Sequence, residues 1–147
     1  MRRFIVNNIF VDTNVLIYFS YAESVYNEKA KAKLKELSKE NQLFISNQIT
    51  LEYINTITNE RLFKENTITI KQAIANIDLF LSFIKIANSS PEYKDIKDGI
   101  LDYNLTRAKL FDLNIYLTML ANGINKILTV NKKDFDLFKN IQVLGLE

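Results

Sequence analysis

Apolar residues along the chain occur in short runs of strand length and in longer segments with helical spacing. Two short runs, Phe4–Val6 and Ile9–Val11, lead directly into Asp12, and a further apolar segment, Val15–Phe19, follows it. The pattern predicts a buried strand and then a helix, with the carboxylate of Asp12 at the turn between them. Ligands of open α/β folds bind at this edge of the sheet. A buried carboxylate needs donors, a cation or water, so Asp12 is the first candidate functional residue.

The remaining pattern predicts alternating helices and strands. Helices are expected over Glu23–Glu40, Asn47–Asn59 (capped by Ser46), Ile68–Ala87, Gly99–Lys109 and Asp112–Asn122. Strands are expected at Leu43–Ile45, Ile127–Val130 and Ile141–Leu146, with a short helix or turn at Lys132–Phe138. Short apolar strands separated by helices indicate an α/β fold whose parallel sheet is covered on both faces.

Two apolar surfaces have alternative interpretations. Leu79, Phe83 and Ile86 form a second stripe on the helix expected over Ile68–Ala87, which is either another core contact or an oligomer face. Tyr18, Phe19 and Tyr21 on the first helix are candidates for an exposed partner groove. For both surfaces the sequence pattern is compatible with packing in the core and with association with a partner.

Composition suits one domain with a sizeable core. The chain has 147 residues, 48% of them hydrophobic, with only 3 Gly and 1 Pro. No apolar stretch reaches the length that spans a bilayer, and the short run after the basic Met1–Arg3 fits a first strand better than a signal peptide. We therefore expect a soluble, cytoplasmic protein with no membrane partner.

The residue types that are missing restrict the chemistry. The chain has no Cys and no His, which excludes disulfides, thiolate or imidazole zinc sites, cysteine nucleophiles and histidine bases. Catalysis would have to use carboxylates, hydroxyls, amines or a hard metal held by oxygen. The net charge of +2 permits a polyanionic partner without predicting one.

Three carboxylates are expected at the same edge of the sheet. Asp12 ends the first strand, Glu52 lies near the start of the helix after the second strand, and Asp112 begins the buried helix. Taken singly, the two aspartates could be helix N-caps and the glutamate a boundary residue. If the three converge, a bridging Mg²⁺ or Mn²⁺ would relieve their repulsion. Such an ion activates water and stabilises phosphate charge, which favours phosphodiester hydrolysis.

Four segments carry a family resemblance: Val11–Leu16, Gln48–Tyr53, Asp112–Ile115 and Thr129–Phe135. They resemble the PIN-domain ribonucleases, which include the VapC-type toxins of toxin–antitoxin pairs, over nearly the whole chain. The resemblance implies a three-layer α/β/α fold with a short, mainly parallel central sheet, so that residues 1–147 form a single PIN-like domain. It also implies cleavage of an RNA substrate at an acidic Mg²⁺ or Mn²⁺ site, a homodimer and an antitoxin partner.

The resemblance assigns roles by motif position. Catalytic and metal-binding positions match Asp12, Glu52 and Asp112, and supporting polar positions match Thr13, Asn14 and Thr129. The chain departs from the family at Asn131, where many relatives carry Asp, and after Asp112, where Leu-Asn-Ile replaces Ala-Leu-Ile or similar. Asn131 keeps an oxygen but loses the charge, which would weaken a second metal; Asp134 could compensate as a metal ligand.

Cations flank the same motifs. Arg107, Lys109, Lys132 and Lys133 lie near Asp112 and Asn131 in the sequence. They could hold RNA phosphates without reading sequence, or they could be ordinary solvated side chains.

Other function classes remain open from the sequence. A catalytically weak PIN module could act as a protein or RNA scaffold, since Asn131 removes a charge from the site. A PIN nuclease of RNA processing would need no antitoxin. A receiver-like phosphotransferase also begins with a strand-end Asp, but it usually carries a further acid at positions that Asn14 or Asn7 and Asn8 occupy here.

Overall fold

The structure, a computed structural model, describes residues 7–147. Its strands are β1 (Asn7–Val11), β2 (Asn41–Ile45), β3 (Ile84–Ile86), β4 (Lys126–Leu128) and β5 (Gln142–Leu144). Its α-helices are α1 (Thr13–Ser20), α2 (Asn27–Glu40), α3 (Asn47–Ile57), α4 (Glu60–Phe63), α5 (Ile70–Phe80), α6 (Tyr93–Tyr103) and α7 (Lys109–Ala121). Two 3₁₀ turns, η1 (Lys64–Asn66) and η2 (Lys132–Asp134), complete the elements.

The strands form one parallel sheet. Within residues 7–147 it has five strands in the order β3-β2-β1-β4-β5. β1 pairs with β2 on one side, Ile9 opposite Leu43, and with β4 on the other, Val11 opposite Leu128. The chain therefore moves outward from β1 through β2 to β3 and then returns to β4. This reversal places a topological switch point between the carboxyl ends of β1 and β4, where open α/β folds bind ligands.

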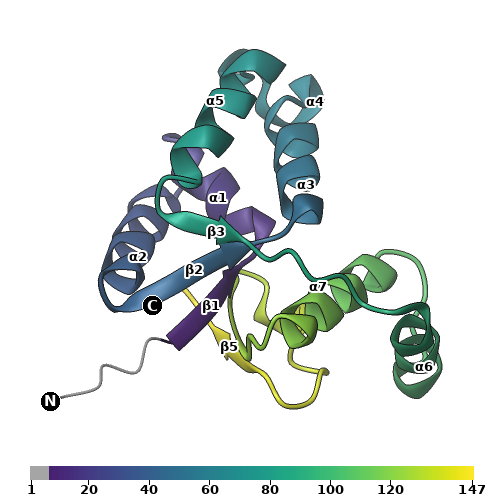
Figure 1. Ribbon diagram of the computed structural model, residues 1–147. Helices are drawn as coiled ribbons and strands as arrows, with labels where there is room; N and C mark the ends of the chain where they lie inside the picture. The colour runs from purple at the N-terminus through teal and green to yellow at the C-terminus, as the bar shows by residue number, and fades with distance from the viewer. Residues whose placement is uncertain (1–6) are drawn as a thin grey trace, which may run out of the picture.

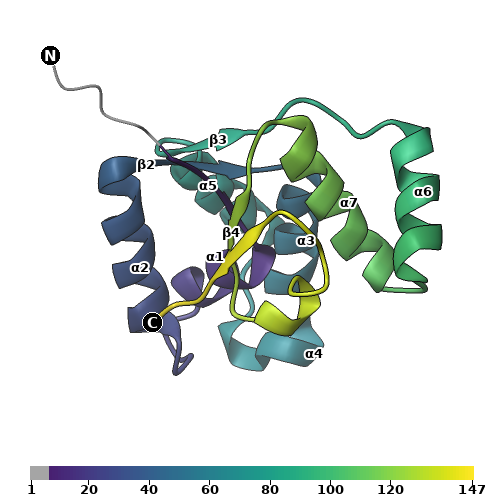
Figure 2. The same ribbon diagram turned by 90° about the horizontal axis from the view of Figure 1, so that it is seen from below.

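Helices cover both faces of the sheet, as Figures 1 and 2 show. α1, α3 and α5 gather on one face, and α6 and α7 lie on the other. Because both faces are covered, the central strands contribute to the core: Phe10, Val11, Leu43 and Ile45 have no exposed surface. The predicted three-layer α/β/α class with a parallel sheet is confirmed. The part of the first predicted strand at Phe4–Val6 lies outside the described residues.

The long helix predicted over Ile68–Ala87 is wrong in its last third. α5 ends at Phe80, and Ile84–Ile86 form the edge strand β3, parallel to β2. Ile84 and Ile86 alternate with the exposed Lys85, which is the spacing of a strand, and Ile84 is buried opposite Leu43. Leu79, Phe83 and Ile86 consequently share no helix face, so the predicted second stripe does not exist.

α6 and α2 begin at different residues from those predicted. α6 runs over Tyr93–Tyr103 and not Gly99–Lys109; it stops at Asn104, whose φ of 54° is left-handed. Gly99 lies inside α6, where an added Cβ would come within 2.7 Å of Leu113 on α7, so this glycine marks a close helix contact and not a boundary. α2 begins at Asn27 and not Glu23, because the amide of Asn27 donates to the carbonyls that end α1.

Neither Ser46 nor Asp112 caps its helix in the way that the sequence suggests. Ser46 occupies the predicted N-cap of α3, but its buried hydroxyl makes no capping hydrogen bond. α7 begins three residues before Asp112, at Lys109, so Asp112 lies in the first turn and is not an N-cap.

No helix in the described part of the chain has the length and apolarity needed to cross a membrane.

Candidate active site

Asp12 lies at the switch point, directly after β1. Its backbone N–H donates to the Leu128 carbonyl at 2.9 Å, which continues the ladder between β1 and β4. Its Oδ1 accepts from the Thr13 N–H at 2.8 Å, so Asp12 caps α1 as the structural alternative proposed. Its Oδ2 accepts from the Thr129 hydroxyl at 2.7 Å and from the Asn14 amide at 3.2 Å. Within residues 7–147 the carboxylate is thus fixed by three neutral side chains or backbone groups and by no cation.

Burial and neighbouring negative charge raise the pKa of the Asp12 carboxyl. Only 8% of Asp12 is exposed, and desolvation raises its pKa from 3.8 to about 6. The hydrogen bonds from Thr129 and Thr13 oppose this shift, whereas the charges of Glu52 and Asp112 add to it. Glu52 and Asp112 line the same cavity as Asp12, so their charges lie on the same side of the sheet edge as its carboxylate.

Thr129 organises the polar groups at the end of β4. Its fully buried hydroxyl accepts from the Asn14 amide at 3.3 Å and from the Asn131 N–H at 3.1 Å. Because both acceptor positions are occupied, its proton is directed to Asp12. The Asn14 carbonyl oxygen in turn accepts from the Val130 N–H at 3.2 Å. The supporting positions predicted from the motifs therefore join β1, α1 and β4 in one network.

Glu52 projects from α3 and is held by both of its oxygens. Oε2 accepts from the Thr13 hydroxyl at 2.6 Å, and Oε1 accepts from the Gln48 amide at 2.7 Å. Gln48 also accepts from the Asn114 amide at 2.5 Å and donates to the Phe111 carbonyl at 3.2 Å. Glu52 is thereby oriented from α1 and indirectly from α7.

Gln48 and Asn114 are positioning residues that sequence reasoning missed. Gln48 lies one turn before Glu52 on α3, so its spacing alone could have identified it. Asn114 stands in the Leu-Asn-Ile segment, where the chain departs from the family pattern. The departure has a structural role, because Asn114 connects α7 to the Gln48 amide that holds Glu52.

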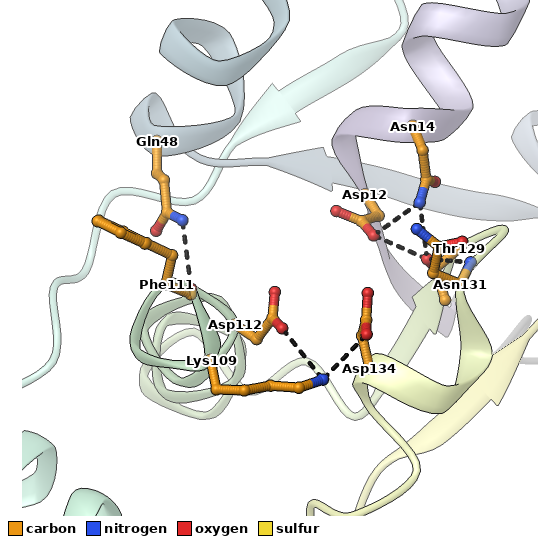
Figure 3. Close-up of polar contacts among 9 residues, drawn as sticks. All are labelled: Asp12, Asn14, Gln48, Lys109, Phe111, Asp112, Thr129, Asn131 and Asp134. Carbon is orange, nitrogen blue, oxygen red and sulfur yellow. Dashed lines mark hydrogen bonds and ion pairs between the residues drawn. The ribbon is translucent and has the colours of Figure 1, made fainter. Parts of the chain in front are cut away.

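Asp112 and Asp134 share a single lysine. Lys109 Nζ lies 2.9 Å from Asp134 Oδ1, with which it forms a hydrogen bond, and 3.6 Å from Asp112 Oδ2. Figure 3 shows the ammonium between the two carboxylates, with Asp12 on the opposite side of them. Burial raises the pKa of Asp112, Asp134 and Glu52 raise it further, and Lys109 opposes the shift.

The four acids described above line one open cavity of about 510 Å³. Its wall includes Asp12, Thr13, Asn14, Glu52, Asp112, Asn131 and Asp134. Among residues 7–147, however, no three acidic side chains lie close enough to form a ready metal-binding group. The predicted acids therefore share a cavity, while their oxygens stay separated in this structure.

The predicted phosphate-binding cations do not share one location. Lys109 contacts the acids directly. Lys132 lines a different hollow, with Tyr26 and Lys29. Arg107 lies in the loop before α7 with a φ of 55°, and both it and Lys133 are exposed. A role for these residues in RNA binding stays a prediction.

The three aromatic residues of the predicted partner groove lie in two different surroundings, and a partner there stays a prediction. Tyr18 and Tyr21 line the acidic cavity, together with Leu62 and Phe63. Phe19 instead packs edge-on against Phe80 at a centroid distance of 5.4 Å, as part of the core boundary. Acidic and aromatic side chains thus line the same cavity, and Phe19 is not among them.

Comparisons with known proteins agree with the fold. The model of the PIN domain family matches residues 9–141. A comparison with curated proteins finds no match. Solved structures with the same fold include DNA-bound VapBC from Salmonella typhimurium, with a TM-score of 0.68, 14% identity and coverage of 97% of this chain and 100% of that chain.

Two further structures are similar at comparable identity. VapBC2 from Rickettsia felis, bound to a DNA fragment from its promoter, has a TM-score of 0.66 and 19% identity, covering 94% of this chain and 98% of that one. VapC20 from Mycobacterium tuberculosis, a toxin that cleaves the sarcin-ricin loop, has a TM-score of 0.56 and 18% identity, covering 81% and 86%. At these identities the similarities establish the fold alone.

Proposed function

Because the chain belongs to the PIN domain family, we propose that it is a metal-dependent endoribonuclease and the toxin of a VapBC-type toxin–antitoxin pair. One observation carries the proposal: Asp12, Glu52, Asp112 and Asp134 line a single cavity at the switch point of the sheet. Membership in the PIN domain family excludes the alternative of a receiver-like phosphotransferase. The cleavage of RNA and the metal are the parts of this proposal that need experiments.

The donor set fits a hard divalent cation. Asp12, Glu52 and Asp112 would hold Mg²⁺ or Mn²⁺, because their oxygens are the ligands that these ions prefer. Desolvation and the charges of the other two acids raise the pKa of Asp12, so a cation between them would offset an existing repulsion. When bound, the ion would activate water and stabilise charge on the phosphate.

The chain's other residues orient the acids for this task. Thr129 and the backbone of Thr13 fix the two oxygens of Asp12. The Thr13 hydroxyl and Gln48 fix the two oxygens of Glu52. All of these donors are neutral, so they direct the carboxylates without cancelling the negative charge that attracts a cation. Partners of this kind strengthen metal sites by fixing ligand orientation.

Cleavage of labelled RNA tests the activity. The wild-type protein should cleave with Mg²⁺ or Mn²⁺ and not in excess EDTA. Asp12→Asn should lose cleavage while its circular dichroism spectrum stays that of a folded protein. Asp78→Asn, at an exposed position on α5, serves as a control that keeps full activity. Equal cleavage by Asp12→Asn, or cleavage in EDTA, would refute the assignment.

A non-catalytic scaffold is the second candidate. It is favoured by Asn131, which supplies no charge, and by Lys109, which already pairs with Asp112 and Asp134. Titration calorimetry separates the two functions. Absence of Mn²⁺ binding at millimolar concentrations would support the scaffold and count against the enzyme.

The partners in the proposal are an antitoxin and a second copy of the chain. The similar structures include VapBC complexes, which supports an antitoxin partner. A small protein encoded beside this gene that copurifies with the chain and inhibits its cleavage would establish the toxin assignment. If no neighbouring product inhibits it, a PIN nuclease of RNA processing is the better description.

A further inference from the structure

We propose that the Lys109 ammonium takes the place of a second metal ion, so that the site binds a single divalent cation on the side of Asp12 and Glu52. The inference rests on the proposed metal site and assigns a function to a side chain that the acid motif does not include. It follows from which of the cavity's carboxylates pair with a positive charge.

Lys109 is positioned by two elements. It begins α7, three residues before Asp112, a spacing that places both side chains on the same helix face. Asp134 reaches the same ammonium from η2, at 2.9 Å from Nζ. The lysine side chain is 41% exposed, whereas Asp112 is 22% exposed and Asp134 40%. The cation therefore lies between two cavity-lining carboxylates that come from separate parts of the chain.

The two halves of the site differ in whether a positively charged group neutralises their carboxylates. At Asp112 and Asp134 two carboxylates share one positive charge, because Lys109 Nζ lies 3.6 Å from Asp112 Oδ2 and 2.9 Å from Asp134 Oδ1. At Asp12 and Glu52 the hydrogen-bond partners within residues 7–147 are hydroxyls, amides and backbone N–H groups, which carry no charge. A divalent cation gains most where the negative charge is uncompensated.

Asn131 is consistent with this division. It lines the cavity and uses its backbone N–H to hold Thr129, and its side chain adds no charge. A second metal at Asp112 and Asp134 would have to displace an ammonium already within hydrogen-bond distance and would gain no carboxylate from position 131. Asp112 pairs with Lys109 through Oδ2, so its other oxygen is left for the first ion.

Mn²⁺ titration of the full-length protein tests the inference without measuring activity. Calorimetry should give one Mn²⁺ per wild-type chain. Lys109→Met should bind a second Mn²⁺, or bind the first roughly 10-fold more tightly or better, because a repelling charge has been removed. Lys109→Arg, which keeps the charge, should retain the wild-type stoichiometry.

The chain offers a matched control. Lys94 pairs with Asp98 at 2.8 Å on the outer surface of α6, so Lys94→Met removes a comparable ion pair away from the cavity and should bind Mn²⁺ as the wild type does. Melting curves would show whether Lys109→Met is folded; if it is not, Lys109→Gln, which retains a donor without the charge, replaces it and has the same expected result.

Two results would overturn the inference. They are two Mn²⁺ ions of similar affinity on the wild-type protein, or unchanged stoichiometry and affinity after the charge at Lys109 is removed. Both would leave the proposed nuclease intact. Failure of every variant to bind Mn²⁺ would instead contradict the metal site itself and the inference with it.

Discussion

Asp12 combines a structural role with an electrostatic penalty. It caps α1 and continues the ladder to β4, yet its burial raises its pKa to about 6. A helix cap alone would be served equally well by Asn, Ser or Thr. A buried carboxylate at this position is therefore explained better by a function that needs its charge than by stability.

The raised pKa predicts how stability depends on pH. Between 3.8 and about 6 the metal-free folded state binds the Asp12 proton more tightly than the unfolded state. The free energy of unfolding should therefore fall as pH rises through this window, by roughly 3 kcal/mol in total. Asp12→Asn should abolish this contribution and be more stable than the wild type at pH 7 in EDTA.

Urea unfolding at several pH values measures this effect. The advantage of Asp12→Asn should shrink toward pH 4, where the wild-type carboxyl is also neutral. Added Mn²⁺ should stabilise the wild type and not the variant. A variant less stable than the wild type at pH 7 would show that Asp12 has a structural role that Asn cannot fill.

Thr129 gives a second prediction at the residue scale. Thr129→Val keeps the shape of the side chain but removes the hydroxyl that donates to Asp12 at 2.7 Å. Mn²⁺ affinity should fall by about 10- to 100-fold, as for other groups that orient metal ligands. Thr118→Val, at another buried threonine on α7, is the calorimetric control. Equal affinity in both variants would remove Thr129 from the site.

The sequence predicted the acids better than it predicted their partners. Asp12, Glu52 and Asp112 were identifiable because each follows or begins an expected element near one sheet edge. The contact between Lys109 and Asp134 was not, because it joins α7 to η2 and depends on how these elements pack. The lysine was instead assigned to RNA from its sequence position alone.

At the scale of elements, Tyr53 fixes α3 relative to its neighbours. Its buried hydroxyl lies 2.7 Å from the Ser20 hydroxyl on α1 and accepts from the Asn76 amide on α5 at 3.0 Å. These contacts set the relation between the helices that carry Thr13 and Glu52. The geometry of the acids thus depends on packing one turn or more away from them.

Tyr53→Phe should destabilise the protein by about 1–3 kcal/mol, because it leaves buried polar groups without a partner. Chemical denaturation measures the change. Tyr93→Phe, at a position that is 74% exposed, should have no effect. If both variants are as stable as the wild type, the Tyr53 hydroxyl does not hold the helices together.

The wrong prediction of one helix over Ile68–Ala87 also has its cause at the scale of elements. α5 and β3 are separated only by Leu81, Ser82 and Phe83, without Gly or Pro, so local sequence offers no stop signal. β3 forms because its three residues complete the sheet beside β2. Such tertiary pairing overrides local preference and is invisible to periodicity in a short segment.

At the scale of the whole molecule, the order of the strands determines where the candidate active site lies. Parallel strands with helices on both faces could be predicted from the pattern of apolar runs. Their order, and hence the switch point between β1 and β4, could not, because the returning connection through α6 and α7 spans the far face. That return brings Thr129 to Asp12.

The proposed homodimer is also a whole-molecule prediction. Ile70 and Ile74 are 61% and 47% exposed and lie one turn apart on α5; burying such side chains favours association. Sedimentation should show a dimer that Ile74→Lys converts to a monomer. Leu101→Lys, at a 72% exposed position on α6, should leave the dimer unchanged. A monomeric wild type would contradict the prediction, and a dimeric Ile74→Lys would move the interface elsewhere.

The central claim is that the acids at the switch point hold a divalent cation, and anomalous diffraction from crystals grown with Mn²⁺ tests it most directly. We predict one anomalous peak in contact with the carboxylates of Asp12 and Glu52, with Lys109 still between Asp112 and Asp134. The absence of a peak in this cavity at saturating Mn²⁺ would contradict the account.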